Sequence, residues 1–203
     1  MKHSKTFLAA AALFAAMGAH AQVTGSLGGG SGTFLELSNA GLSGGSVATL
    51  TGGTVYTASQ PFADIPAGAI FGGRFLAAGP TSGATAVLTF TGAGVGYISF
   101  LWGSPDTYNR LTVTSTGGFT QNFDTSTLGF AVSDGNQNFS QYVQFSGLGG
   151  SKITSLSFTN LPATDAFETA NFSVTAPVPE PQTYALLLAG LGAVAFVARR
   201  RRA

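Results

Sequence analysis

The chain of 203 residues contains no cysteine, and both of its histidines, His3 and His20, lie close to the N-terminus. Everything after His20 therefore lacks the side chains needed for a Ser-His-Asp triad, a Cys-His nucleophile, a zinc protease site or a histidine-based iron site. Disulfides are excluded as well, so the fold must be stabilised by apolar burial and backbone hydrogen bonding.

Charged residues are scarce too, at 8% of the chain, and six of the nine Lys and Arg residues are Lys2, Lys5 and residues 199–202. Between Gln22 and Ala176, three basic residues face seven acidic ones, which gives this body a net charge of −4. The basic residues are Arg74, Arg110 and Lys152, and the acidic residues are Glu36, Asp64, Asp106, Asp124, Asp134, Asp165 and Glu168. A weakly acidic, sparsely charged body argues against nucleic acid or anionic lipid as its partner.

The first residues have the three parts of a secretory signal. Lys2, His3 and Lys5 form a positive start, residues 7–18 are apolar, and Ala19-His20-Ala21 has the small-x-small pattern of a cleavage site. The sequence therefore predicts a signal helix over residues 1–21 that is removed after export. The alternative, an uncleaved anchor, is disfavoured because the apolar run is too short to span a bilayer comfortably.

The last residues form a second three-part signal: a Pro-rich break, an uncharged apolar run over 184–198 and a basic cluster. The run would measure about 22 Å as a helix, against a hydrocarbon core of roughly 30 Å, which suits a transient transmembrane helix. The basic cluster should stay cytoplasmic, with the body outside. The sorting residues would be Val178, Pro179, Glu180, Pro181, Arg199, Arg200, Arg201 and Arg202.

This arrangement over residues 177–203 resembles the PEP-CTERM sorting signal of Gram-negative bacterial surface proteins. The resemblance implies an exported protein that uses the secretion machinery, resides transiently in the inner membrane, is processed by an exosortase and reaches the cell surface or extracellular matrix, including biofilm polysaccharide. It leaves open whether the tail is cleaved or retained. The alternative is a Pro-rich linker before an ordinary tail anchor.

Apolar residues between the two signals recur with period two. Ile98, Phe100 and Trp102 share one parity, and Leu111 and Val113 alternate with polar neighbours. Strands are expected at 34–37, 47–50, 54–56, 71–76, 84–90, 98–102, 110–114, 142–145, 153–158 and 167–174, separated by Gly-rich breaks. We predict an all-β domain over 33–176, an antiparallel β-sandwich of jelly-roll type, after a flexible Gly/Ser lead-in over 22–32.

Two patterns bear on catalysis and metal binding. The seven scattered carboxylates allow a glycoside hydrolase in principle, but most stand beside turn residues, where Asp bonds to its own backbone. Residues 134–138, Asp-Gly-Asn-Gln-Asn, resemble the start of a calcium loop, yet Phe139 and Phe145 occupy the positions where an EF-hand needs Gly and Glu. No cofactor or EF-hand metal site is expected; a calcium site assembled from distant loops stays open.

The segment 102–110 combines Trp102, Asp106, Tyr108 and Arg110, a mixture of aromatic and polar side chains that sugar-binding sites use. The alternative for Trp102 is a core position, because it shares the parity of Ile98 and Phe100. We therefore expect a non-catalytic surface or matrix protein that binds carbohydrate or serves as a structural component. The alternatives are a carboxylate-based glycoside hydrolase and a calcium-dependent lectin-like module.

Overall fold

The computed structural model describes residues 23–174 and 190–191. One sheet, sheet A, contains β1 (Val23–Leu27), β5 (Thr54–Tyr56), β6 (Phe75–Ala78), β8 (Tyr97–Gly103), β11 (Ser140–Gly147) and β13 (Phe167–Ser173). The other, sheet B, contains β2 (Leu37–Ser38), β3 (Gly41–Leu42), β4 (Ala48–Thr51), β7 (Ala86–Phe90), β9 (Asn109–Ser115), β10 (Thr120–Phe123) and β12 (Ile153–Asn160). Three short helices lie between the strands: η1 (Ser43–Gly45), η2 (Pro80–Ser82) and α1 (Thr125–Leu128).

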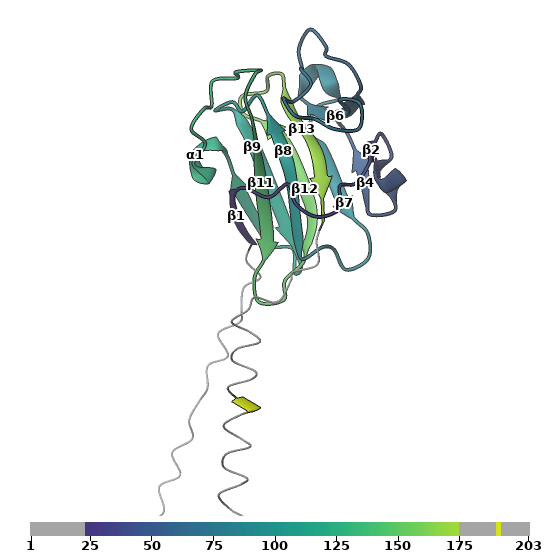
Figure 1. The fold of residues 1–203 in the computed structure, drawn as a ribbon, viewed down its shortest axis with the longest axis vertical. Coiled ribbons are helices and arrows are strands. Elements are labelled where there is room, and N and C mark those ends of the chain that lie inside the picture. Colours follow the sequence, from purple (N-terminus) through teal and green to yellow (C-terminus); the bar gives the residue numbers. More distant parts are fainter. Residues whose placement is uncertain (1–22, 175–189, 192–203) are drawn as a thin grey trace, which may run out of the picture.

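The two sheets are antiparallel throughout and lie face to face (Figure 1). The strand order is β1-β11-β8-β13-β6-β5 in sheet A and β10-β9-β12-β7-β4-β3-β2 in sheet B. These sheets confirm the predicted all-β, two-sheet class. The narrower jelly-roll assignment stays a prediction.

Aromatic side chains fill the space between the sheets. Phe100 of β8 meets Phe158 of β12 edge to face, with ring centroids 5.5 Å apart, and lies 5.3 Å from Phe172. Ile98, Phe100 and Trp102 are all fully buried in this core, as their shared parity predicts. Burial of such large side chains contributes roughly 1.5–3 kcal/mol each, which gives a chain without disulfides its stability.

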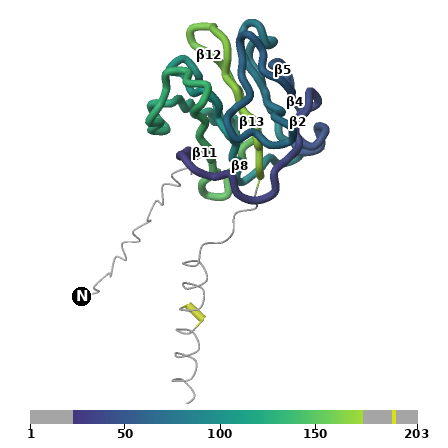
Figure 2. Tube along the Cα trace, turned by 45° about the horizontal axis from the view of Figure 1, so that its top comes forward, coloured from purple at the N-terminus to yellow at the C-terminus, as the bar shows by residue number. Residues whose placement is uncertain are grey.

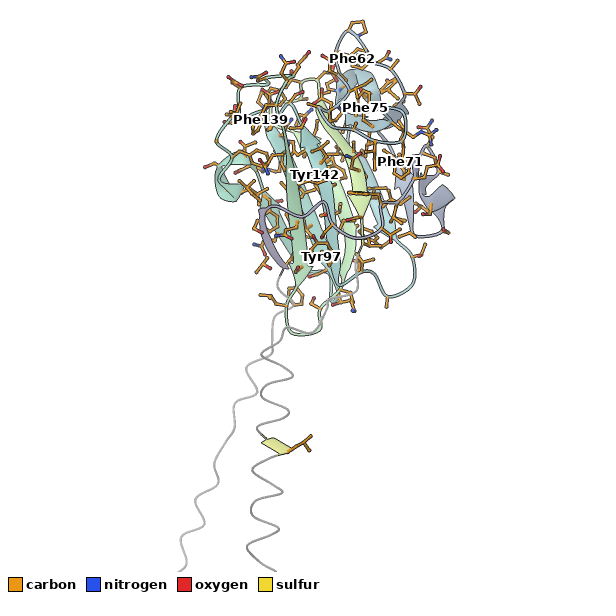
Figure 3. The ribbon with its side chains drawn as sticks, in the orientation of Figure 1. Phe62, Phe71, Phe75, Tyr97, Phe139 and Tyr142 are labelled. Carbon is orange, nitrogen blue, oxygen red and sulfur yellow. The ribbon has the colours of Figure 1, made fainter. Side chains whose placement is uncertain are left out.

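The segment 57–74, here called the strap, covers the outer face of sheet A. A second apolar cluster lies beneath it, with Ala63 from the strap against Leu101 of β8 and Ala170 of β13, and Phe62 and Ile65 at its margin. As a result all seven residues of β13 are buried, because the core covers one face and the strap the other. Figure 3 labels two aromatic side chains of this region, Phe62 of the strap and Phe75 of β6.

Asn171 fastens the strap to the sheet. The register of β13 shifts between Ala170 and Ser173, and Asn171 takes a left-handed φ of 53°, which asparagine tolerates better than most residues. Its side chain accepts from Ile70 N at 2.8 Å and donates to Gly68 O at 2.9 Å. The bulge in β13 thus directs the side-chain amide of Asn171 toward the strap.

Several sequence expectations are corrected. The predicted flexible lead-in 22–32 contains β1, which pairs with β11 from Val23 opposite Gly147 to Leu27 opposite Val143. Of the strand expected at 34–37, only an isolated bridge at Phe34 and the start of β2 at Leu37 are present. The strand expected from Phe71 begins at Phe75 instead, because Phe71 lies in a turn with a φ of 54°.

Both described ends of the body lie at the same end of the sandwich (Figure 2). Val23 pairs with Gly147, whose N–H donates to Gly96 O at the start of β8. Ser173, at the end of β13, pairs with Ser99 in the first half of the same strand. The turn after β8, and Pro66 of the strap beside Gly103, therefore lie at the opposite end.

Candidate functional site

Trp102 is a core residue. Its side chain is fully buried, stacks on Phe167 with ring centroids 4.3 Å apart and meets Phe130 edge to face at 5.2 Å. The indole Nε1 donates to Asn109 Oδ1 at 3.3 Å. A buried ring cannot stack on a sugar, so the predicted ligand-binding role of Trp102 is wrong, and the alternative core position is confirmed.

A buried amide network continues from Trp102. Asn109 Oδ1 also accepts from Asp106 N at 2.8 Å, and its Nδ2 donates to Asn160 Oδ1 at 3.0 Å. Asn160 Nδ2 in turn donates to Ala78 O at 3.1 Å. Strands of both sheets are thereby joined through side-chain amides, because buried polar groups must find partners. Neither Asn109 nor Asn160 was predicted as a site residue, since only the tertiary fold brings them together.

The other residues of the predicted sugar site do not share one surface. Arg110 is exposed on β9 of sheet B, where it pairs with Thr159. Tyr108 is half-buried, and its hydroxyl donates to Asp165 O at 2.9 Å. Burial and then the neighbouring Asp106 carboxylate raise the pKa of Tyr108. Asp106 and Tyr108 are thus parts of a packed turn and not a free ligand platform.

An acidic group lies beneath the strap. Glu168 of β13 is 3% exposed; its Oε1 accepts from Asp64 N at 3.3 Å, and its Oε2 has no partner among the described residues. Burial, together with the Asp106 and Asp64 carboxylates, raises the pKa of Glu168 to about 8. The pKa of Asp106 is also raised, first by burial and then by Asp134. Burial beneath the strap leaves Glu168 without access to a polymeric substrate.

The loop 134–138 bonds to itself. Asp134 Oδ1 accepts from Asn136 N at 3.2 Å, and Asn136 Oδ1 accepts from Asn138 N at 3.0 Å. These bonds are the local turn interactions that short polar side chains favour. Within residues 23–174 and 190–191, no group of three or more Asp, Glu or His side chains is arranged to hold a metal ion.

A groove runs along the open side of the sandwich, where the edge strands β1 and β10 come together. Its volume is about 530 Å³, and its lining combines hydroxyl, amide and apolar groups without a charged side chain. The lining residues are Val23, Thr24, Gly25, Gln121, Asn122, Phe123 and Thr127. This groove was not predicted, because residues 22–32 were expected to be a flexible lead-in and no strand was expected over 120–123.

A second, smaller cavity of about 270 Å³ lies at the other side of the body, beside η2. It is bordered by Pro80, Ala84, Thr159 and Ala163, and by the amide of Asn160, whose nitrogen already donates to Ala78 O and Thr164 O. Neither this cavity nor the groove is lined by a carboxylate.

The fold and its cavities define an all-β, two-sheet body whose described residues include neither a metal cluster nor a histidine. Residues 177–202 match the family model of the PEP-CTERM protein-sorting motif. The chain therefore carries an exosortase-dependent sorting signal and is exported to the cell envelope, as the sequence predicts. No curated protein and no solved structure matches the chain.

The residues of the sorting signal lie outside the described part of the structure, as do the predicted signal helix at 1–21 and most of the predicted membrane span at 184–198. Within that span, Gly190 and Leu191 are helical, and Leu191 is exposed. Over the residues that are described, the structure contains no helix with the length and apolar character needed to cross a bilayer.

Proposed function

We propose that this chain is a non-catalytic surface protein, sorted through its tail, whose β-sandwich acts in the extracellular matrix by binding carbohydrate. The observation that carries the proposal is the sorting motif at 177–202, which begins a few residues after β13 completes the sandwich. We assign the role after export to the packed body over residues 23–174, which lies before this signal.

The chemistry of the body supports a binding role. Glycoside hydrolysis needs two carboxyl groups on opposite sides of a substrate cleft. In the described residues Glu168 is covered by the strap, and neither the groove nor the cavity beside η2 has a carboxylate in its lining. The surface of the body is sparsely charged, and its Ser, Thr, Asn and Gln side chains suit contact with neutral polyhydroxyl polymers. These side chains donate hydrogen bonds to hydroxyl groups and accept hydrogen bonds from them.

The sorting part of the proposal is tested by replacing Pro179, Glu180 and Pro181 together with Ala. If this triplet is the recognition element of the exosortase, the variant should accumulate as an uncleaved precursor in the inner membrane. Mass spectrometry of the mature carboxyl terminus and membrane fractionation measure the outcome. Thr175→Ala, just before the motif, is the control and should be processed normally. Normal processing of the triplet variant would contradict the proposal.

Replacing Arg199–Arg202 with Gln tests the second half of the signal. Removal of four positive charges weakens the retention of the tail on the cytoplasmic side. We expect more full-length protein in the extracellular fraction, with the Pro-Glu-Pro triplet intact. An unchanged distribution between the two fractions would show that the basic cluster does not act as the stop signal.

A further inference from the structure

The groove between β1 and β10 differs from the rest of the surface because both of its walls are sheet edges. Val23, Thr24 and Gly25 of β1 supply one wall, and Gln121 and Asn122 of β10 supply the other. Among the described strands, β1 pairs with β11 alone and β10 with β9 alone, so each has one unpaired edge. An extended chain can lie along two such edges more readily than a compact metabolite.

The floor of the groove is apolar and its shape is fixed by packing. Phe123 meets Phe145 edge to face with centroids 5.0 Å apart, and its ring lies over Gly25. A Cβ at position 25 would come within 2.7 Å of both aromatic rings, so glycine is required for the strand to approach this closely. These packing contacts fix the shape of the floor without a ligand.

The β10 wall offers an unused side-chain amide. Asn122 is adjacent to Phe123 in β10, so its side chain points to the opposite face, where Oδ1 accepts from Thr112 Oγ1 at 2.7 Å. Gln121 is exposed, and its side chain bonds to no other described residue. By contrast, Thr127 is held in a capping box with Asp124, where its N–H donates to Asp124 Oδ1 at 2.8 Å.

We propose that the groove between β1 and β10 binds a segment of neutral polysaccharide, with the Gln121 amide bonding to sugar hydroxyls beside the Phe123 floor. This inference deepens the proposed function and rests on it. Amides suit hydroxyl ligands, and the absence of charge in the groove gives no basis for recognising a phosphorylated, sulfated or uronic acid polymer. The volume of about 530 Å³ falls within the range of small-ligand sites.

The test is affinity electrophoresis of the full chain in a sugar-free detergent, through gels that contain dextran, soluble starch, hydroxyethyl cellulose or the acidic polymer alginate. We expect retardation by at least one neutral polymer, insensitive to salt and to calcium chelation. Gln121→Ala should weaken that retardation by about five- to tenfold, the usual effect of losing a hydrogen bond to a bound ligand. Asn122→Ala should leave the retardation close to that of the wild type, because this side chain lies on the opposite face of β10.

Gln137→Ala is the matched control, because Gln137 is also an exposed glutamine but lies in the loop 134–138, away from the groove. The control should be retarded like the wild type. Three outcomes would overturn the proposal: no retardation by any neutral polymer, equal loss in both glutamine variants, or dimerisation through this edge that Gln121→Ala abolishes. Export and processing of the same variants are measured separately, so a failed groove is distinguishable from a failed sorting signal.

Discussion

At the scale of single residues, Trp102 joins the apolar core to the buried amides. Its ring packs on Phe167, and its Nε1 donates to Asn109. Period-two alternation placed the ring inside, because parity along a strand follows from backbone geometry alone. The amide partner was not predictable, since Asn109 is a polar residue whose burial depends on Asn160 and on the Ala166 carbonyl from distant parts of the chain.

Trp102→Ala should therefore lower the free energy of unfolding by about 3–5 kcal/mol, through a cavity and an unpaired Asn109. Trp102→Phe keeps most of the apolar volume and loses the Nε1 bond, so its loss should be clearly smaller. Urea denaturation followed by circular dichroism measures both. A loss of less than about 1 kcal/mol for the Ala variant would contradict the core role.

Glu168 predicts a pH dependence of stability. Its pKa of about 8 in the folded protein lies above the ordinary value of 4.5, so folding takes up a proton between these limits. The contribution of Glu168 to stability should thus be complete below about pH 4.5, fall as the pH rises to about 8 and level off above it, by at most about 1.4 kcal/mol per pH unit. The raised pKa of Asp106 acts in the same direction.

Glu168→Gln removes this titration while Oε1 can still accept from Asp64 N. The variant should be more stable than the wild type at about pH 9, and its melting temperature should change less with pH. Glu36→Gln is the control, because Glu36 is an exposed carboxylate paired with Arg74 at the surface, and it should keep the wild-type profile. Parallel pH profiles of Glu168→Gln and the wild type would refute the assignment.

At the scale of elements, strands with a regular apolar period were predictable and those without one were not. β7, β8, β9, β11, β12 and β13 coincide with predicted strands to within a few residues. β10 reads Thr-Gln-Asn-Phe, and three of its four residues are exposed, so no alternation marks it. β1 lies in a Gly-rich stretch and is defined by its pairing with β11, a contact that local sequence does not encode.

The strap was not predicted either, because its attachment depends on side chains from β13 and on close contact with β8. A Cβ at Gly103 would approach Pro66 Cγ to 2.7 Å, so the strap can lie flat only over a glycine. All seven residues of β13 are buried, so both faces of this strand are covered. That pattern does not indicate which segment of the chain covers the outer face.

Gly103→Ala should lift the strap without disturbing the core between the sheets. The added methyl group meets Pro66, whereas the core residues Phe100 and Trp102 are unaffected. We expect faster limited proteolysis within 57–74 and a loss of about 1–3 kcal/mol, the usual cost of overpacking. An unchanged cleavage rate together with wild-type stability would show that Pro66 moves aside freely.

At the scale of the whole molecule, charged residues are distributed unevenly between the body and the ends of the chain. Six of the nine Lys and Arg residues lie at positions 2, 5 and 199–202 and make the full chain cationic, while residues 22–176 carry a net charge of −4. The sorting signal was recognisable from sequence because it is a linear pattern at one end of the chain. The groove was not, because it exists only where the edges of two sheets meet.

The position of β13 determines how the body would respond to a pull on the residues that follow it. A pull on the tail would enter the body at Ser173 and act along β13, which is hydrogen-bonded to β8 on one side and β6 on the other. Ser173 Oγ adds contacts to Ser99 Oγ at 2.9 Å and to Ser31 O at 2.8 Å. Because both ladders would be loaded in shear at once, traction from a surrounding matrix would have to break many bonds together, whereas an edge strand would unzip one bond at a time.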